Sequence, residues 1–295
     1  YSVSILGSGR VVNWVSPSRW EKGKDGLSYI EKESLIYSLY SYFYDEFDFI
    51  NIAQNYETTP EESEWAARFQ DVIQSVSGIG GTIFDNSGSF GSSGKLTGII
   101  EFWERNGLAK LGLHELVHNW GNKAEKSSLP NPSEVSPSHW GYRNIGGQLG
   151  GWLPGSLEDL GGGNYRAKNP ETGEFGSWDP VNGQRYGLSV YGNFELYVMG
   201  LIDAASIGHD IKTAEDFEWV DEASGIFKAS NITSMTIDEF IAVEGIRKPD
   251  YLNSQKSFRG MYVVLSGEPL SIEEWRAADR AAYDIQLTSD TGNTI

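Results

Sequence analysis

The sequence predicts an α+β fold with a twisted mixed sheet, one long helix and a long loop segment rich in glycine and aromatic residues. Three observations support this: residues 1–105 mix strand-like and helical periodicity, residues 106–210 hold one strong helical pattern followed by a glycine-rich stretch, and residues 211–295 return to regular structure. We expect the three parts to form a single domain over 1–295, because a chain of 295 residues is long enough for one substantial core.

The first part alternates helices and strands. The expected elements are an aromatic amphipathic helix at 34–47, a strand at 48–55, a helix at 59–76, a glycine- and serine-rich loop at 77–94 and a strand at 95–103. The helix at 59–76 is predicted because Thr59 is a suitable cap, Pro60 suits the first turn and acidic residues follow directly.

The segment 127–192 lacks clear periodicity and is rich in Gly, Pro, Asn and Ser. Its aromatic residues are Trp140, Tyr142, Trp152, Tyr165, Trp178, Tyr186 and Tyr191. A loop of this length inside a compact domain is usually functional, and so many aromatic side chains favour an ordered segment that packs.

The last part carries the strongest local signals. We expect a capped helix at 236–245, a strand at 259–267 and a helix at 270–285. Ser271 and Glu274 fit a capping box, and Leu270 can pack against Trp275 as a hydrophobic staple. We expect this strand and these helices to pack around the outside of the sheet.

Composition narrows the classes of partner and site. The formal net charge of -18 argues against nucleic acid or anionic lipid, and it is compatible with a secreted protein or with bound calcium. A start at Tyr1 without methionine is compatible with a removed leader. No apolar run is long enough for a membrane span. We also expect the protein to be a monomer. The absence of cysteine excludes disulfides and thiolate zinc sites.

The stretch 111–122, LGLHELVHNWGN, contains the pattern HExxH. On a helix, His114 and His118 lie on one face, so both imidazoles can reach one Zn²⁺ ion. Glu115 lies beside the first ligand, where a carboxylate can act as general base toward a zinc-activated water. The four histidines of the whole chain make a chance match improbable.

With these residues the chain resembles the HExxH zinc metallopeptidases, the zincins. The stretch continues as HExxHxxG, which is the start of the longer metzincin pattern. In that pattern the glycine, here Gly121, turns the chain sharply and a third histidine follows three residues later. The position of that histidine is Ala124 here, so the resemblance implies a zincin whose third ligand is displaced.

A catalytic zinc normally has three protein ligands and a water, so a third ligand must be found. The first choice is His139, twenty-one residues after His118. The rival is Glu195, because gluzincins use a glutamate on a downstream helix and because a buried glutamate needs a metal or a partner. Asn193 is a plausible cap for the helix of Glu195, whose other role would be to accept a ring N–H from a histidine ligand. Asp203 and Asp179 are weaker candidates, and His209 resembles a surface-loop histidine.

Two further features fit the resemblance. Metzincins place a methionine in a tight turn beneath the zinc, and Met199-Gly200 is similar, although an ordinary core role explains Met199 equally well. Tyr197 is our candidate donor to the oxyanion of the tetrahedral intermediate, and Tyr142, Tyr186 and Tyr191 are its alternatives.

The function that follows from these residues is that of a secreted zinc metallopeptidase, an endopeptidase, which hydrolyses peptide bonds of extracellular proteins. Its partners would be protein or peptide substrates. Two alternatives remain open: a glycan- or protein-binding module with a structural zinc, and a zinc hydrolase of non-peptide amides or esters.

Overall fold

The computed structural model describes residues 2–5, 9–17, 26–59, 65–125, 129, 138–178 and 190–285, without the side chains of 2–5, 122 and 125. The chain forms two compact units. The first unit contains Tyr1–Ser75, Ile83–Asn119 and Ser257–Ile295, and the second contains Val76–Thr82 and Trp120–Lys256. Both units draw on segments other than the three parts named above, and the single-domain organisation stays a prediction.

The first unit is built around one sheet. Its strands are β1 (Ser2–Ile5), β2 (Val11–Val15), β3 (Phe49–Tyr56), β4 (Ala67–Asp71), β7 (Gly98–Glu104) and β14 (Gly260–Ser266), with the short pair β5 (Ile73–Gln74) and β6 (Phe84–Asp85) beside them. Its helices are α2 (Tyr29–Leu39), the 3-10 turn η1 (Ser87–Phe90), α6 (Ile272–Asp284) and α3 (Gly107–Glu125), whose residues after Asn119 belong to the second unit.

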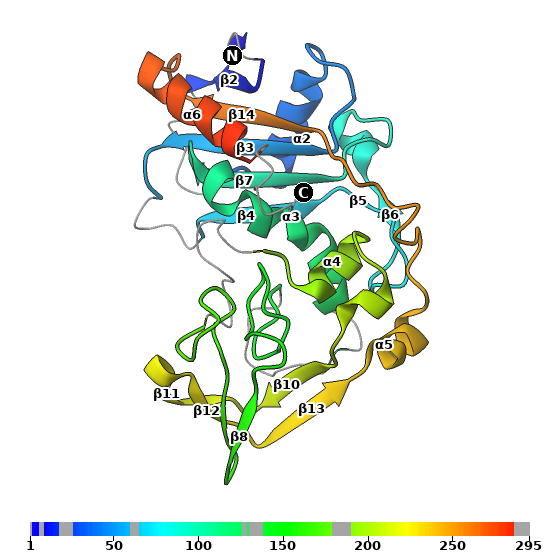
Figure 1. Ribbon diagram of the computed structural model, residues 1–295. Helices are drawn as coiled ribbons and strands as arrows, with labels where there is room; N and C mark the ends of the chain where they lie inside the picture. Colours follow the sequence, from blue (N-terminus) through cyan, green and yellow to red (C-terminus); the bar gives the residue numbers. More distant parts are fainter. Residues whose placement is uncertain are drawn as a thin grey trace. The chain divides into compact units, whose positions relative to one another are not determined.

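The sheet is mixed, as predicted for an α+β fold. Its six strands lie in the order β1-β2-β14-β3-β7-β4 (Figure 1). The inner neighbours β2, β14, β3 and β7 pair in parallel, whereas β1 and β4 pair antiparallel at the two edges.

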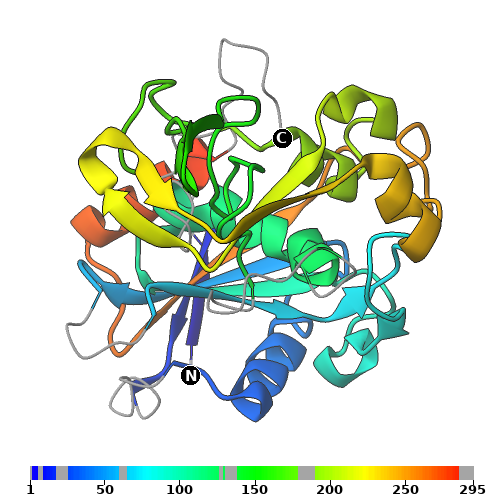
Figure 2. The same ribbon diagram turned by 90° about the horizontal axis from the view of Figure 1, so that it is seen from below.

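Side-chain alternation along β14 divides the core into two layers. Met261, Val263 and Leu265 belong to a cluster with α2, whereas Tyr262 and Val264 belong to a cluster with α3 and α6. Figure 2 accordingly shows α2 (blue) on the opposite face of the sheet from α3 (green) and α6 (orange to red). Because both faces are covered, the central strand is almost uninterruptedly apolar.

The position of β14 corrects one expectation. This strand was expected to pack around the outside, but it lies in the middle of the sheet between β2 and β3. Its register with Val11 and Ile50 joins residues that are more than two hundred positions apart. Sequence periodicity identifies a strand but carries no information on which neighbours it takes.

The helix predicted at 59–76 is wrong where the structure describes it. Residues 67–71 form β4, which pairs antiparallel with β7, and β5 follows at once. Pairing with β7 places Arg68 beside Glu101, whose carboxylate it binds at 2.8 Å. This tertiary pairing overrides the local helical pattern. Residues 60–64, which carry the expected helix start, lie outside the described residues.

The other predicted elements of this unit are found with shifted bounds. The helix predicted at 34–47 is confirmed only in part. α2 begins at Tyr29, because Ser28 and Glu31 form a capping box, and it ends at Leu39, so residues 40–47 are not helical. The strands at 48–55, 95–103 and 259–267 are confirmed as β3, β7 and β14. The predicted capping box of Ser271 and Glu274 begins α6, so the helix at 270–285 is confirmed as well.

The second unit has little regular structure for its length. Its strands are β8 (Glu158–Gly161), β9 (Asn164–Arg166), β10 (Ile211–Glu215), β11 (Glu218–Asp221), β12 (Ile226–Lys228) and β13 (Asn231–Met235). Its helices are α4 (Asn193–Met199) and α5 (Ile237–Glu244), with the 3-10 turns η3 (Ala204–Ile207) and η4 (Glu222–Ser224). The strands form the sheet β11-β12-β9-β8 and the pair β10-β13. α5 is the predicted capped helix, and Gly245 ends it.

The core of this unit is aromatic. Trp152 and Trp178 are buried and pack with Phe227 in one cluster, and Tyr142 stacks on Phe217 with ring centroids 4.0 Å apart. The prediction that the glycine-rich segment packs is confirmed for its described part. None of the described helices is long and apolar enough to cross a membrane.

Candidate metal centre

Helix α3 presents two histidines on one face. His114 and His118 are four residues apart, and both are buried. Their Nε2 atoms lie 3.3 Å apart. Two nitrogens bound at about 2.05 Å to a tetrahedral zinc ion lie about 3.3 Å apart, so the pair has the separation that a shared ion requires.

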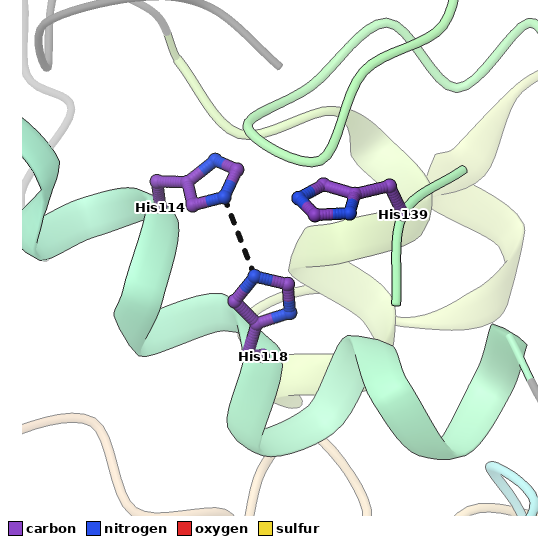
Figure 3. A group of neighbouring side chains, drawn as sticks. All are labelled: His114, His118 and His139. Atoms are coloured by element: carbon purple, nitrogen blue, oxygen red, sulfur yellow. Dashed lines mark hydrogen bonds between the residues drawn. The ribbon is translucent and has the colours of Figure 1, made fainter. Parts of the chain in front are cut away.

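His139 completes a group of three. One ligand atom of each of His114, His118 and His139 lies within 4.8 Å of the others, and Figure 3 shows the three imidazoles turned toward one another. No other group of at least three His, Asp or Glu side chains within ligand distance occurs among the described residues. Three nitrogen donors with His139 only half-buried fit an ion such as Zn²⁺ that keeps an open position.

Glu115 is the residue that the motif predicts as a general base. Its side chain is buried, and burial raises the pKa of its carboxyl group to about 8. Its Oε2 atom has no hydrogen-bond partner among the described residues. A buried carboxyl group with an unsatisfied oxygen is unfavourable for stability, and such groups concentrate at functional sites. A cation bound nearby would favour the charged carboxylate.

Gly121 does not turn the chain, which corrects the expectation taken from the metzincin pattern. α3 continues through Gly121 to Glu125. Ala124, which occupies the position of the third metzincin histidine, is buried. The glycine is needed for close packing instead. A Cβ atom at Gly121 would lie 2.5 Å from Leu149 Cδ1 and 3.4 Å from the ring of Trp140.

Glu195, the rival third ligand, is not in the three-histidine group. It is fully buried in α4, and its two carboxylate oxygens accept hydrogen bonds from Trp140 and from three backbone N–H groups. Burial raises the pKa of Glu195 and these four donors lower it, with a net rise. The cap of α4 is Gly192 rather than the expected Asn193.

Tyr197 and Met199 lie on the same helix. The phenol of Tyr197 is buried, its oxygen has no hydrogen-bond partner among the described residues, and burial raises its pKa against the opposing charge of Arg247. The role of Tyr197 as an oxyanion donor stays a prediction. Met199 is buried at the end of α4, and Gly200 follows in the left-handed conformation with φ 79°.

The weaker ligand candidates have other contacts. Asp203 caps η3 by accepting from the backbone N–H and the hydroxyl of Ser206. The Nδ1 atom of His209 lies 3.0 Å from the Asp210 carbonyl oxygen, and its ring is half-buried rather than fully exposed. Asp179 lies outside the described residues.

The alternative tyrosines are placed only in part. Tyr142 stacks on Phe217, and Tyr191 is buried, which raises the pKa of its phenol. Tyr186 lies outside the described residues. Their local sequences do not distinguish any of these tyrosines as an oxyanion donor.

The backbone donors around Glu195 were not expected from the sequence. The N–H groups of Gln148, Leu149 and Gly192 point at its carboxylate. The one available signal is the glycine pattern of the stretch 146–151, GGQLGG, because glycines allow a backbone to approach a neighbour closely.

Comparison with known proteins gives no relative from which a function can be transferred. No protein-family model, no curated protein and no solved structure matches the chain. Any assignment of function therefore depends on the residues of the site themselves.

Proposed function

We propose that this protein is a zinc-dependent metallopeptidase in which His114, His118 and His139 hold the ion and Glu115 is the general base. The observation that carries the proposal is the convergence of the three imidazoles beside a buried carboxyl group. The HExxH spacing of the zincins supports the same assignment.

The histidines and Glu115 have separate tasks in this mechanism. The three imidazoles would hold a Zn²⁺ ion, which would supply a bound water of lowered pKa and a Lewis acid for the scissile carbonyl group. Glu115 accepts a proton from the attacking water and then delivers it to the nitrogen of the leaving amine. The position of Glu115 next to His114 and its buried, unsatisfied Oε2 atom support this role.

A protein or peptide is the proposed substrate, since the zincin resemblance implies amide hydrolysis. The glycan-platform alternative has less support. Trp140 and Trp152 are fully buried and Trp178 is 2% exposed, so these rings fill the core and offer no face to a ligand.

The test combines metal analysis with a hydrolysis assay. Wild-type protein should bind one zinc per chain and cleave casein. Glu115→Gln should keep the zinc and lose about 100-fold or more in rate, because general-base catalysis is removed. Glu218→Gln is the matched control, since Glu218 is an exposed glutamate of β11.

Two results would contradict the proposal. One is full casein hydrolysis by Glu115→Gln. The other is a zinc-loaded wild-type protein that cleaves simple esters or non-peptide amides but neither casein nor peptides. That result would favour the alternative of a zinc hydrolase of non-peptide amides or esters.

A further inference from the structure

We propose that Glu195 is a positioning residue for the metal centre: its carboxylate fixes the backbone segment 140–149 and thereby holds the imidazole of His139 toward its partners. The inference rests on the proposed function, in which His139 is a zinc ligand. Glu195 itself contacts neither the ion nor the substrate in this proposal.

The carboxylate of Glu195 is saturated with hydrogen bonds. Oε1 accepts from Trp140 Nε1 at 2.8 Å and from the Leu149 N–H at 2.9 Å. Oε2 accepts from the N–H groups of Gln148 and Gly192, each at 2.9 Å. The residue is 0% exposed, and these four donors match the roughly four acceptor positions of a carboxylate.

The donors include both ends of one segment. Trp140 lies at its start and Leu149 at its end, and the Trp140 N–H also donates to the Leu149 carbonyl at 2.8 Å. The segment is therefore closed into a loop around a single carboxylate. Since His139 directly precedes Trp140, fixing Trp140 restricts the backbone from which the imidazole extends.

Two glycines show how closely this loop is packed. A Cβ atom at Gly147 would lie 2.0 Å from Glu195 Oε2, so the loop backbone lies directly against the carboxylate. At Gly121 on α3, a Cβ atom would meet Leu149 at 2.5 Å and Trp140 at 3.4 Å. The two residues that bind Oε1 therefore also pack on α3, one turn after His118.

The hydrogen-bonding capacity of an ionised carboxylate explains why position 195 is a glutamate. A carboxylate only accepts, and all four of its neighbours donate. A glutamine of the same shape would turn an NH₂ group toward two of the N–H donors and leave those donors without an acceptor. Glu195→Gln thus changes the loop with almost no change in side-chain volume.

The experiment is a double-mutant cycle on zinc affinity, measured by competition with a chromogenic chelator. The variants are Glu195→Gln, His139→Ala and the two combined, with Glu218→Gln as the control. Glu195→Gln should weaken zinc binding about tenfold, which is typical for a residue that orients a ligand. In the His139→Ala background the same change should alter affinity by less than about twofold, because the ligand through which Glu195 acts is gone.

Other outcomes overturn the inference. Unchanged zinc affinity in Glu195→Gln would do so, and so would an equal loss in both backgrounds, which indicates a general effect on the fold. If Glu195→Gln does not fold, Trp140→Phe removes the indole N–H that donates to Oε1 and keeps a smaller aromatic ring, and the cycle is judged by the same criteria. Unchanged affinity in His139→Ala alone would refute the third ligand of the proposed function, a result separable from any effect of Glu195.

Discussion

Two fully buried glutamates, one in each unit, are stabilised in different ways. Glu101 on β7 of the first unit lies 3.2 Å from Lys32 Nζ and 2.8 Å from Arg68 Nη2. Glu195 in the second unit accepts four N–H donors, and no described cation forms an ion pair with it. The Leu27 N–H and the Gln54 amide also donate to Glu101 Oε1, at 2.7 and 3.1 Å. Opposite charges and dipoles together balance the first carboxylate, whereas the partners of the second among the described residues are dipoles alone.

The difference follows from what surrounds each residue. On the sheet, the backbone N–H groups of β7 pair with neighbouring strands, and Glu101 is neutralised by the side chains of Lys32 and Arg68, with one backbone donor from Leu27. In the loop, the N–H groups of Gln148, Leu149 and Gly192 belong to no strand, and Glu195 supplies their acceptors. The partners of the first carboxylate are mainly side chains, whereas those of the second are mainly backbone groups, so the second determines the path of a backbone.

The largest expected effect is that of Glu101→Gln. It leaves the ammonium group of Lys32, a residue only 4% exposed, without its carboxylate. Breaking a buried pair in this way costs about 3–5 kcal/mol, so the free energy of unfolding in urea should fall by that amount. The control is Glu46→Gln, which breaks the exposed pair with Arg259 and should cost less than about 1 kcal/mol. Equal losses for the two variants would refute the distinction.

Gly147→Ala should have an intermediate effect. The new methyl group would overlap the Glu195 carboxylate, so neighbouring atoms must shift. Overpacking of this kind lowers the free energy of unfolding by about 1–3 kcal/mol. Urea unfolding measures the loss, and Gly88→Ala is the control because a Cβ atom there meets nothing within 4 Å. A Gly147→Ala protein as stable as the control would show that the loop is not held against the carboxylate.

Arg68→Lys should have the smallest effect. Arg68 donates two hydrogen bonds to Glu101 Oε2, but its side chain is 35% exposed and Lys32 remains in place. Loss of the forked geometry at this partly solvated position should cost about 0.5–1 kcal/mol in urea unfolding. A loss as large as that of Glu101→Gln would show that the forked hydrogen bonds of Arg68, and not the charge of Lys32, are the main stabilising contact of Glu101.

Predictability from sequence depended on how local the determining interactions are. α5 and α6 were predicted well because Thr236 and Ser271 each form a capping box with a glutamate three residues later. The helical pattern over residues 67–74 is misleading because the local sequence does not show that 67–71 pair with β7 and that 73–74 pair with β6. The place of β14 in the sheet was missed for the same reason.

The site divides in the same way. HExxH fixes His114, Glu115 and His118 through helical spacing alone, and His139 was reached because few histidines remained. The contacts of Glu195 could not be predicted, since three of its four partners are backbone N–H groups, which every residue except proline carries. The packing role of Gly121 is not predicted because the metzincin pattern assigns a chain turn to this glycine.

The central position of β14 has a consequence for the order in which the chain is synthesised. Until residue 260 emerges, β2 and β3 lack the strand that joins them, and the sheet exists as the two parts β1-β2 and β3-β7-β4. Each part exposes an unpaired parallel edge, which is open to pairing with other chains. The entire segment 120–256 is made during this interval. The nascent protein therefore depends on β14 to close its sheet, and the two open edges persist until residues 260–266 have been made.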